Sequence, residues 1–188
     1  TATIPVGAAV RHVPGTPIVV AADLGTDPAA AGATIMNGAT GDVLDLADVD
    51  IDFGSTPTFD LAAAQATTDG GVVALTDFNS MQTAIVDVAA GTAVLAAGWA
   101  TGIANDFVAL NNVEARTADF VTHAGEPISS VALPDAIDGT DLGGGVALLI
   151  GFGGELNRID PEHEAPVALP GLDIDPESIA GTFPALGG

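Results

Sequence analysis

The chain has 188 residues, which fits one domain, and a hydrophobic content of 48%, which is enough for a core. Its 25 acidic residues are opposed by three arginines and no lysine, so the formal net charge is -22. Nucleic acids and anionic membranes are bound through cationic side chains, so this charge argues against both as partners. Cysteine is absent, which excludes disulfides, thiolate nucleophiles and cysteine-based metal sites.

The N-terminal segment 1–17 contains three prolines and is predicted to be an extended arm or an edge strand. Short strands then follow at intervals that are typical of an all-β domain. They are predicted at 18–22, 33–36, 43–46, 57–62, 71–75, 83–88, 92–97, 107–113, 115–121 and 128–133. The dipeptide Asn37-Gly38 predicts a hairpin between the second and third of these strands.

The stretch Asp48–Phe53 alternates acidic and apolar residues, which predicts a half-buried strand with one solvated face. Its aspartates, Asp48, Asp50 and Asp52, also resemble the opening of a calcium-binding loop. Such a loop needs glycine at its sixth position, where this chain has Phe53. We therefore interpret the aspartates as the solvated face of a strand.

The most hydrophobic segment is Gly143–Gly154, with glycines at both ends. It is too short to span a bilayer, which takes about 20 helical residues, and its length and β-branched residues favour a buried strand. The preceding residues 134–143 are predicted to form an acidic loop. After it, residues 155–188 contain five prolines and are predicted to form a C-terminal arm, so that residues 18–154 make up the folded domain.

Ten to twelve short strands without a long helix predict an all-β fold, specifically a jelly roll or another two-sheet antiparallel sandwich. No internal repeat of fixed period is evident in the sequence. Whether a leader was removed before Thr1 stays open.

Several polar residues are candidate metal ligands. They are His12, His123, Glu126, Asp135, Asp138, Asp141, Glu162, His163 and Glu164. A metal site needs converging ligands, whereas neighbours on an extended chain point apart, and chance clusters are expected at this density of aspartate. His12 stands beside Arg11, and this pair is equally uninformative. We assign no metal site.

Gly143-Gly144-Gly145 resembles a phosphate-binding loop, but it precedes an apolar strand in a chain without lysine. Ser129 and Ser130 lie in a predicted strand without a nucleophile elbow around them. No catalytic or cofactor-binding residue is therefore assigned, and the chain is not expected to be an enzyme.

Aspartate outnumbers glutamate by 19 to 6, which together with the missing lysine resembles proteins of salt-loving archaea. At about 1 M salt the Debye length is roughly 3 Å, so such a surface is not self-repelling. The pattern of short strands, including 128–133 and 145–152, and the proline-rich ends resembles a single jelly-roll capsid protein of a halophilic archaeal virus. That resemblance implies a virion subunit that assembles with itself and with other virion proteins in high salt.

Other classes stay open at this stage. A decoration, turret or tail protein of a virion has the same composition and strand pattern. A secreted adhesive or carbohydrate-binding sandwich is disfavoured by one tryptophan and no tyrosine. A cupin-type enzyme is disfavoured because its metal site needs clustered histidines, and the three histidines are far apart in sequence.

Overall fold

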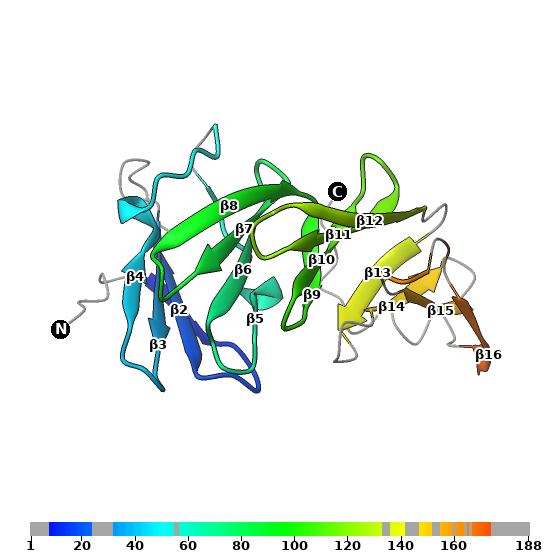
Figure 1. The fold of residues 1–188 in the computed structure, drawn as a ribbon, viewed down its shortest axis with the longest axis horizontal. Coiled ribbons are helices and arrows are strands. Elements are labelled where there is room, and N and C mark those ends of the chain that lie inside the picture. Colours follow the sequence, from blue (N-terminus) through cyan, green and yellow to red (C-terminus); the bar gives the residue numbers. More distant parts are fainter. Residues whose placement is uncertain are drawn as a thin grey trace.

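The computed structural model of the chain describes residues 8–23, 32–54, 57–132, 136–141, 147–151, 155–159, 161–163, 165 and 167–173. Within these residues sixteen strands form four antiparallel sheets, and each sheet contains four consecutive strands in chain order (Figure 1). The only helices in this part of the chain are two short 3-10 turns, neither of which has the length and hydropathy to cross a bilayer.

The strands of each sheet are as follows. The first sheet contains β1 (Ala8–His12), β2 (Ile18–Asp23), β3 (Ala33–Asn37) and β4 (Val43–Asp45). The second contains β5 (Gln65–Ala66), β6 (Val72–Asp77), β7 (Gln82–Asp87) and β8 (Thr92–Ala97). The third contains β9 (Trp99–Ile103), β10 (Phe107–Asn112), β11 (Thr117–Thr122) and β12 (Pro127–Ala132). The fourth contains β13 (Ala136–Asp141), β14 (Ala147–Gly151), β15 (Glu155–Ile159) and β16 (Val167–Asp173).

The prediction of an all-β fold is confirmed. Its finer form, a jelly roll, is not. A jelly roll consists of two sheets whose strands are linked by Greek-key connections, whereas here four sheets are each built as a simple meander. The predicted hairpins at Asn37-Gly38 and at β7–β8 are present with regular antiparallel register.

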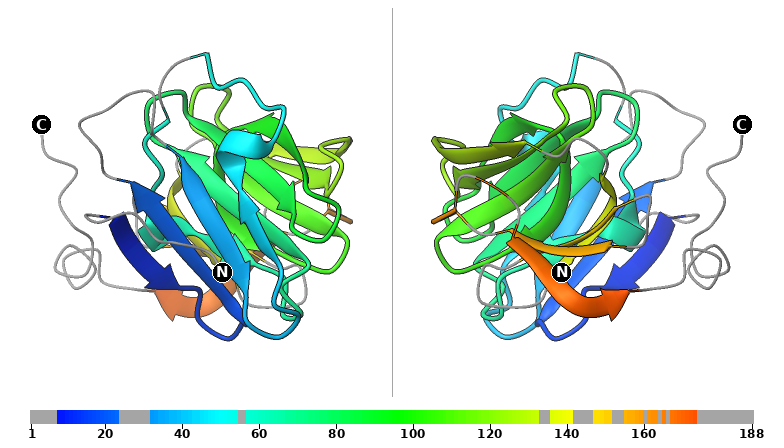
Figure 2. Two further views of the ribbon diagram at one scale, coloured as in Figure 1. Left: turned by 90° about the vertical axis from the view of Figure 1, so that its left-hand side faces the viewer. Right: turned by 90° about the vertical axis from the view of Figure 1, so that its right-hand side faces the viewer.

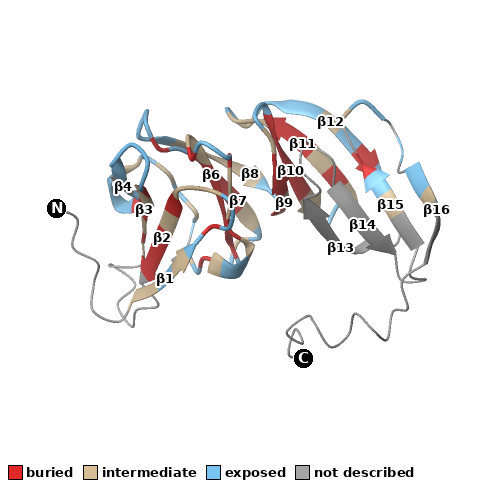
Figure 3. Cartoon of the chain, turned by 90° about the horizontal axis from the view of Figure 1, so that it is seen from below, coloured by how far each residue is buried: buried red, intermediate tan, exposed pale blue. Residues whose placement is uncertain are grey.

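The four sheets follow one another in chain order (Figure 3). Buried side chains pack between neighbouring sheets. Ile18, Val20 and Ile35 of the first sheet pack against Val73 and Leu75 of the second. All five of these side chains are fully buried. The first two sheets therefore share one hydrophobic core.

The next interface uses the opposite face of the second sheet. Ala74 and Ile85 pack there with Val108 and Leu110 of the third sheet, while Val73 and Leu75 face the first sheet. The third sheet in turn presents Phe107, Ala109, Ala118, Phe120 and Val131 to Ile159 of the fourth. Both middle sheets are therefore buried on both faces, which a two-sheet sandwich does not provide.

Neighbouring sheets approach one another near their first strands, since β1 lies beside η2, which leads into β5, while β5 lies beside β9 and β9 beside β13. Gly98, with φ +104°, is the single residue between β8 and β9, and it carries the chain from the second sheet into the third. A Cβ at this glycine would lie 2.8 Å from the carbonyl oxygen of Asn111, so no other residue fits without movement.

The second and third sheets contain a repeated unit that the sequence does not make evident. Three strands of the third sheet each begin 35 residues after a strand of the second. β10 begins at Phe107 and β6 at Val72, β11 at Thr117 and β7 at Gln82, and β12 at Pro127 and β8 at Thr92. The expectation that the chain lacks a repeat of fixed period is therefore wrong for these two sheets.

The segment Asp48–Phe53 is not a strand. A 3-10 turn, η1 (Leu46–Asp48), begins it, and the residues that follow make no strand ladder. The predicted alternation still appears in burial, because Val49, Ile51 and Phe53 pack against the first core and the intervening aspartates are exposed. Residues 57–62 are likewise not a regular strand but an isolated bridge at Phe59 followed by η2 (Leu61–Ala63).

Parts of the segments predicted as arms and as a loop are strands. β1 lies within 1–17 and is at the edge of its sheet, which was one of the two alternatives predicted there. Against the predictions, β13 lies within 134–143, and β15 and β16 lie within 155–188. The proline-rich sequence misled the prediction because β16 is the last strand of its sheet in chain order and pairs with β15, and such an edge strand tolerates Pro170. The domain boundaries at 17 and 154 stay predictions.

Candidate binding cleft

Three connections, one from each of the first three sheets, surround a cleft of about 500 Å³, which we call the inner cleft. They are the β1–β2 turn, the stretch from η2 through β5 into the β5–β6 turn, and the β9–β10 turn. The cleft is therefore built by three consecutive sheets where their first strands end. Its lining residues include Arg11, Val13, Thr16, Ala62, Gln65, Thr67, Thr68, Ile103 and Asn105.

Among the described residues that line this cleft, Arg11 is the only one with a cationic side chain. It pairs with Val20 across β1 and β2, and therefore lies on the face of the first sheet that packs against the second. The residue is half-buried. Its Nε is inaccessible to solvent, and this atom has no hydrogen-bond partner among the described residues. In a chain with 25 carboxylates, an arginine that makes no ion pair with any described residue is unexpected.

The cleft also offers neutral polar side chains. Gln65, Thr68 and Asn105 make no side-chain hydrogen bond to any residue that the structure describes. Thr16 and Thr67, by contrast, are engaged in their own turns, through Val13 and through Asp69. The first three side chains are therefore available to a ligand, while the latter two hold the shape of the rim.

The rim is held by contacts between the first two sheets. Asn37, which is buried, donates from Nδ2 to the carbonyl oxygens of Asp69 and Gly70 at 3.2 and 3.1 Å. Gly38 donates its backbone N–H to the carbonyl of Pro17 at 2.9 Å. These bonds connect three turns, so the cleft wall does not depend on one loop alone.

Asp69 is a charged group of the same rim. Its carboxylate accepts the backbone N–H of Gly71 at 2.9 Å and the hydroxyl of Thr67 at 2.7 Å. These two hydrogen bonds, with the Gly71 bond the stronger influence, lower the pKa of Asp69 below the usual aspartate value. The carboxylate therefore stays ionised and keeps the β5–β6 turn closed.

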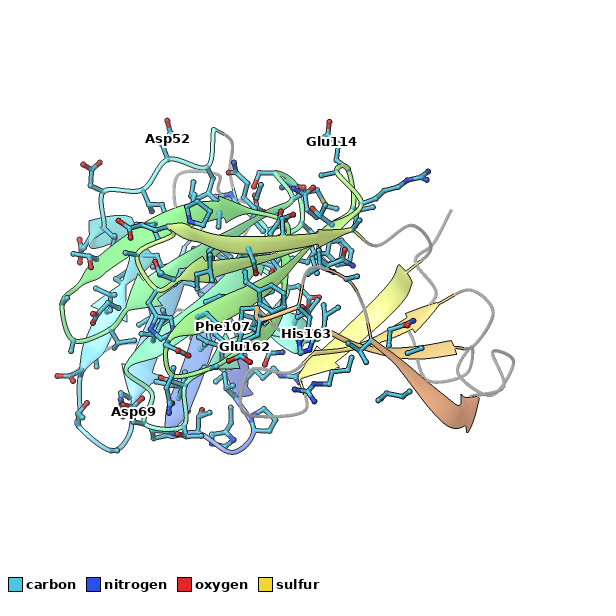
Figure 4. The ribbon with its side chains drawn as sticks, turned by 45° about the vertical axis from the view of Figure 1, so that its right-hand side comes forward. Asp52, Asp69, Phe107, Glu114, Glu162 and His163 are labelled. Atoms are coloured by element: carbon cyan, nitrogen blue, oxygen red, sulfur yellow. The ribbon has the colours of Figure 1, made fainter. Side chains whose placement is uncertain are left out.

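The aspartates of Asp48–Phe53 are far from this cleft. Figure 4 shows Asp52 at the upper edge and Asp69 at the lower edge of the same part of the molecule. Asp45 and Asp52 each accept a backbone N–H two residues later, which is an ordinary local turn interaction. The interpretation of Asp48, Asp50 and Asp52 as solvated residues agrees with their exposure.

The other candidate ligands are not brought together. Asp138 and Asp141 lie on β13 rather than in a loop, and Asp135 lies outside the described residues. His163 is exposed, and Glu164 lies outside the described residues. Across the described part of the chain, no group of three or more histidine, aspartate or glutamate side chains is placed to hold a metal ion.

His123 and Ser130 have structural partners. The Nε2 of His123 lies 2.9 Å from the carbonyl oxygen of Ala104, and the Ser130 hydroxyl donates to Asp119 at 2.5 Å. Ser129 Oγ is buried without a hydrogen-bond partner. His12 bonds to the carbonyl of Thr16 within its own turn, and Gly143-Gly144-Gly145 lies outside the described residues.

Sequence reasoning passed over Arg11 because its neighbour His12 drew attention only as a possible metal ligand. One signal was present, namely an arginine directly after the apolar run Ala8-Ala9-Val10 in a chain that has only three arginines and no lysine. The remaining lining residues come from turns that are far apart in sequence, and only the fold brings them together.

No protein-family model and no curated protein matches this chain. Among solved structures it is similar to the WD40 repeats of RRP9, with 11% identity, a TM-score of 0.53 and coverage of 85% of this chain. It is also similar to a chain of the mitotic checkpoint complex, with 14% identity, a TM-score of 0.51 and coverage of 84%. The matches cover 49% and 52% of those two chains, so this chain spans about half of their length. WD40 repeats are four-stranded blades of a β-propeller, and the likeness is one of fold alone.

Proposed function

We propose that the chain forms four consecutive blades of a propeller-type binding module, and that a macromolecular ligand is recognised at the inner cleft. The observation that carries this proposal is the arrangement of four meander sheets, of which the first three end their first strands around that cleft and the fourth has its first strand, β13, beside β9. Propellers place the first strands of their blades around a central channel, and concave sites of about 300–1,000 Å³ are typical of ligand pockets.

A cleft-filling substitution tests this proposal. Peptides selected from a random display library on the wild-type chain are expected to bind Thr68→Trp at least about tenfold more weakly, because the indole fills the cleft. Thr92→Trp is the matched control, since Thr92 is also an exposed threonine but lies outside the cleft. Failure to select any binder, or equal binding by Thr68→Trp and wild type, would contradict the proposal.

Assembly with further copies, the function expected from the sequence, is a second proposal. It is supported by the face of the first sheet that points away from the second (Figure 2, left). Val10 and Val43 on that face are 53% and 49% exposed, and Val19 and Met36 lie at neighbouring register positions. His12, Thr34 and Asp45 share this face, and the exposed apolar patch between them favours association.

Sedimentation tests this second proposal. Wild type is expected to form larger species in about 3 M salt, where charge repulsion is screened, and to dissociate in dilute buffer. Val43→Asp should remain small in both. A wild-type monomer at both salt concentrations would contradict assembly. The virion location and the absence of enzymatic activity stay predictions.

A further inference from the structure

We propose that the inner cleft recognises a peptide through one carboxylate, which the guanidinium of Arg11 binds. This inference deepens the proposed binding function and rests on it. The observations behind it are the position of Arg11, the burial of its Nε, the absence of an acidic partner among the described residues, and the neutral polar groups around it.

The state of Arg11 calls for an acceptor. A guanidinium has five N–H donors and no acceptor, and a buried donor without a partner is destabilising. Arg11 Nε is such a donor, and because it is closed to solvent, a ligand carboxylate meets the exposed part of the half-buried side chain first and reaches Nε only when that side chain turns toward the cleft. A carboxylate is the ligand that matches the planar fork of arginine, since its two oxygens accept two parallel N–H bonds.

The surrounding charge favours a ligand with one negative charge. Three aspartates lie within two residues of the cleft lining, namely Asp60, Asp69 and Asp106. These aspartates, together with the formal net charge of -22, repel each additional negative charge on a ligand. A phosphate dianion or a nucleic-acid strand is therefore disfavoured relative to a single carboxylate.

The rest of the cleft fits the backbone and small side chains of a peptide. Gln65, Thr68 and Asn105 offer amide and hydroxyl groups that can bond to peptide N–H and C=O groups. Val13 and Ile103 supply apolar contacts. A volume of about 500 Å³ is much larger than one carboxylate needs, so the cleft has room for the residues that flank it.

Binding at Arg11 can be followed directly by NMR, because the chain has only three arginines and therefore only three Nε–Hε signals to resolve. The folded full-length chain is titrated with a blocked tripeptide that has a central aspartate. The Nε–Hε signal of Arg11 is expected to move saturably, while the signals of Arg116 and Arg158 stay in place. The same tripeptide with asparagine in place of aspartate should leave all three unchanged.

Two variants separate recognition from folding. Arg11→Gln should weaken binding of the aspartate peptide by at least about tenfold, since a charged hydrogen bond is lost. Arg116→Gln is the matched control, because Arg116 is exposed in a turn away from the cleft and should bind as wild type does. If Arg11→Gln does not fold, Arg11→Lys keeps the charge, loses the planar fork and should also bind more weakly.

The remaining outcomes decide the inference. Equal movement of the Arg11 signal with inorganic phosphate, or with acetate alone at the same concentration, would overturn carboxylate-peptide recognition. So would equal affinity for the aspartate and asparagine peptides. If display-selected peptides bind Thr68→Trp more weakly than wild type but bind Arg11→Gln with unchanged affinity, the proposed binding module is supported and this inference is contradicted. If Thr68→Trp blocks nothing, the proposed function falls as well.

Discussion

The hydroxyl groups of Thr76 and Thr83 lie 3.0 Å apart and are hydrogen-bonded across β6 and β7 in the core between the second and third sheets. Thr83 donates its proton to the carbonyl of Gly98 at 2.7 Å, so Thr76 is the donor to Thr83. Thr76 in turn accepts the backbone N–H of Ala100 at 3.1 Å. This chain of bonds holds the connection between two stacked sheets.

Removing the middle hydroxyl should destabilise that connection. Thr83→Val is expected to lower the free energy of unfolding by about 1–3 kcal/mol, because it leaves the Thr76 donor and the Gly98 carbonyl without partners in the core. Thr92→Val is the control, since Thr92 is exposed at the start of β8. Denaturant unfolding at fixed salt measures both. An equal effect of the two substitutions would contradict the role of Thr83.

Gly70 should be the least replaceable glycine of the cleft rim. Its φ is +72°, and a Cβ would lie 2.8 Å from both Asn37 Nδ2 and Ile18 Cδ1. Gly41 has a φ of +83° but nothing within 4 Å of a Cβ. Gly41→Ala should therefore show only the backbone penalty of about 1–2 kcal/mol. Gly70→Ala should be a further 1–3 kcal/mol or so less stable, because it also crowds the core. Similar unfolding free energies for the two variants would count against the packing argument.

Asp77 is a fully buried carboxylate that is satisfied without a cation. Its oxygens accept the backbone N–H groups of Thr58, Asn79 and Ser80 and the hydroxyl of Ser80, at 2.6–3.2 Å. Asp77→Asn places an N–H₂ group against donors and should destabilise the chain by about 1–3 kcal/mol. Asp87→Asn is the matched control, because Asp87 is exposed and, among the described residues, its side chain accepts only from the backbone N–H of Ala90. Thermal unfolding measures the stability of both variants. An equal loss of stability in the two would contradict the role given to Asp77.

The turn at Asp69 should respond to acid. Because hydrogen bonds from Gly71 and Thr67 lower the pKa of Asp69 in the folded chain, its ionisation stabilises the fold above the unfolded aspartate pKa. That stabilisation is lost as the pH falls through the folded pKa. Thr67→Ala should raise the pKa of Asp69 toward its usual value, which carboxyl-carbon NMR titration measures. An unchanged titration curve would show that the Thr67 bond does not hold the carboxylate.

Local structure was largely predictable from the sequence, because it depends on neighbouring residues. Asn37-Gly38 predicted its hairpin, and the turn residues around 89–91 predicted β7 and β8. The strand predicted at Asp48–Phe53 is absent because a strand depends on a partner that is distant in sequence. Alternation reports which side chains are buried, and it does not report whether a neighbouring strand is present to form a ladder.

The stacking of sheets was not predictable by the same reasoning. In β6, Val73 and Leu75 face one neighbour while Ala74 faces another, and a buried run of this kind fits several architectures. The 35-residue unit is also hard to detect, since its longest identical stretch is Val73-Ala74-Leu75 compared with Val108-Ala109-Leu110. The inner cleft depends on this stacking, so Arg11 could not be connected with Gln65 and Asn105 from the sequence.

The central claim is that the sheets stack in chain order with the middle two buried on both faces. Methyl NOE spectroscopy tests it most directly. We predict cross-peaks from Ile35 to Val73 or Leu75, from Ile85 to Val108 or Leu110, and from Ile159 to the ring of Phe120. Cross-peaks that instead join the first sheet directly to the third, with none from Ile85 to β10, would contradict the account.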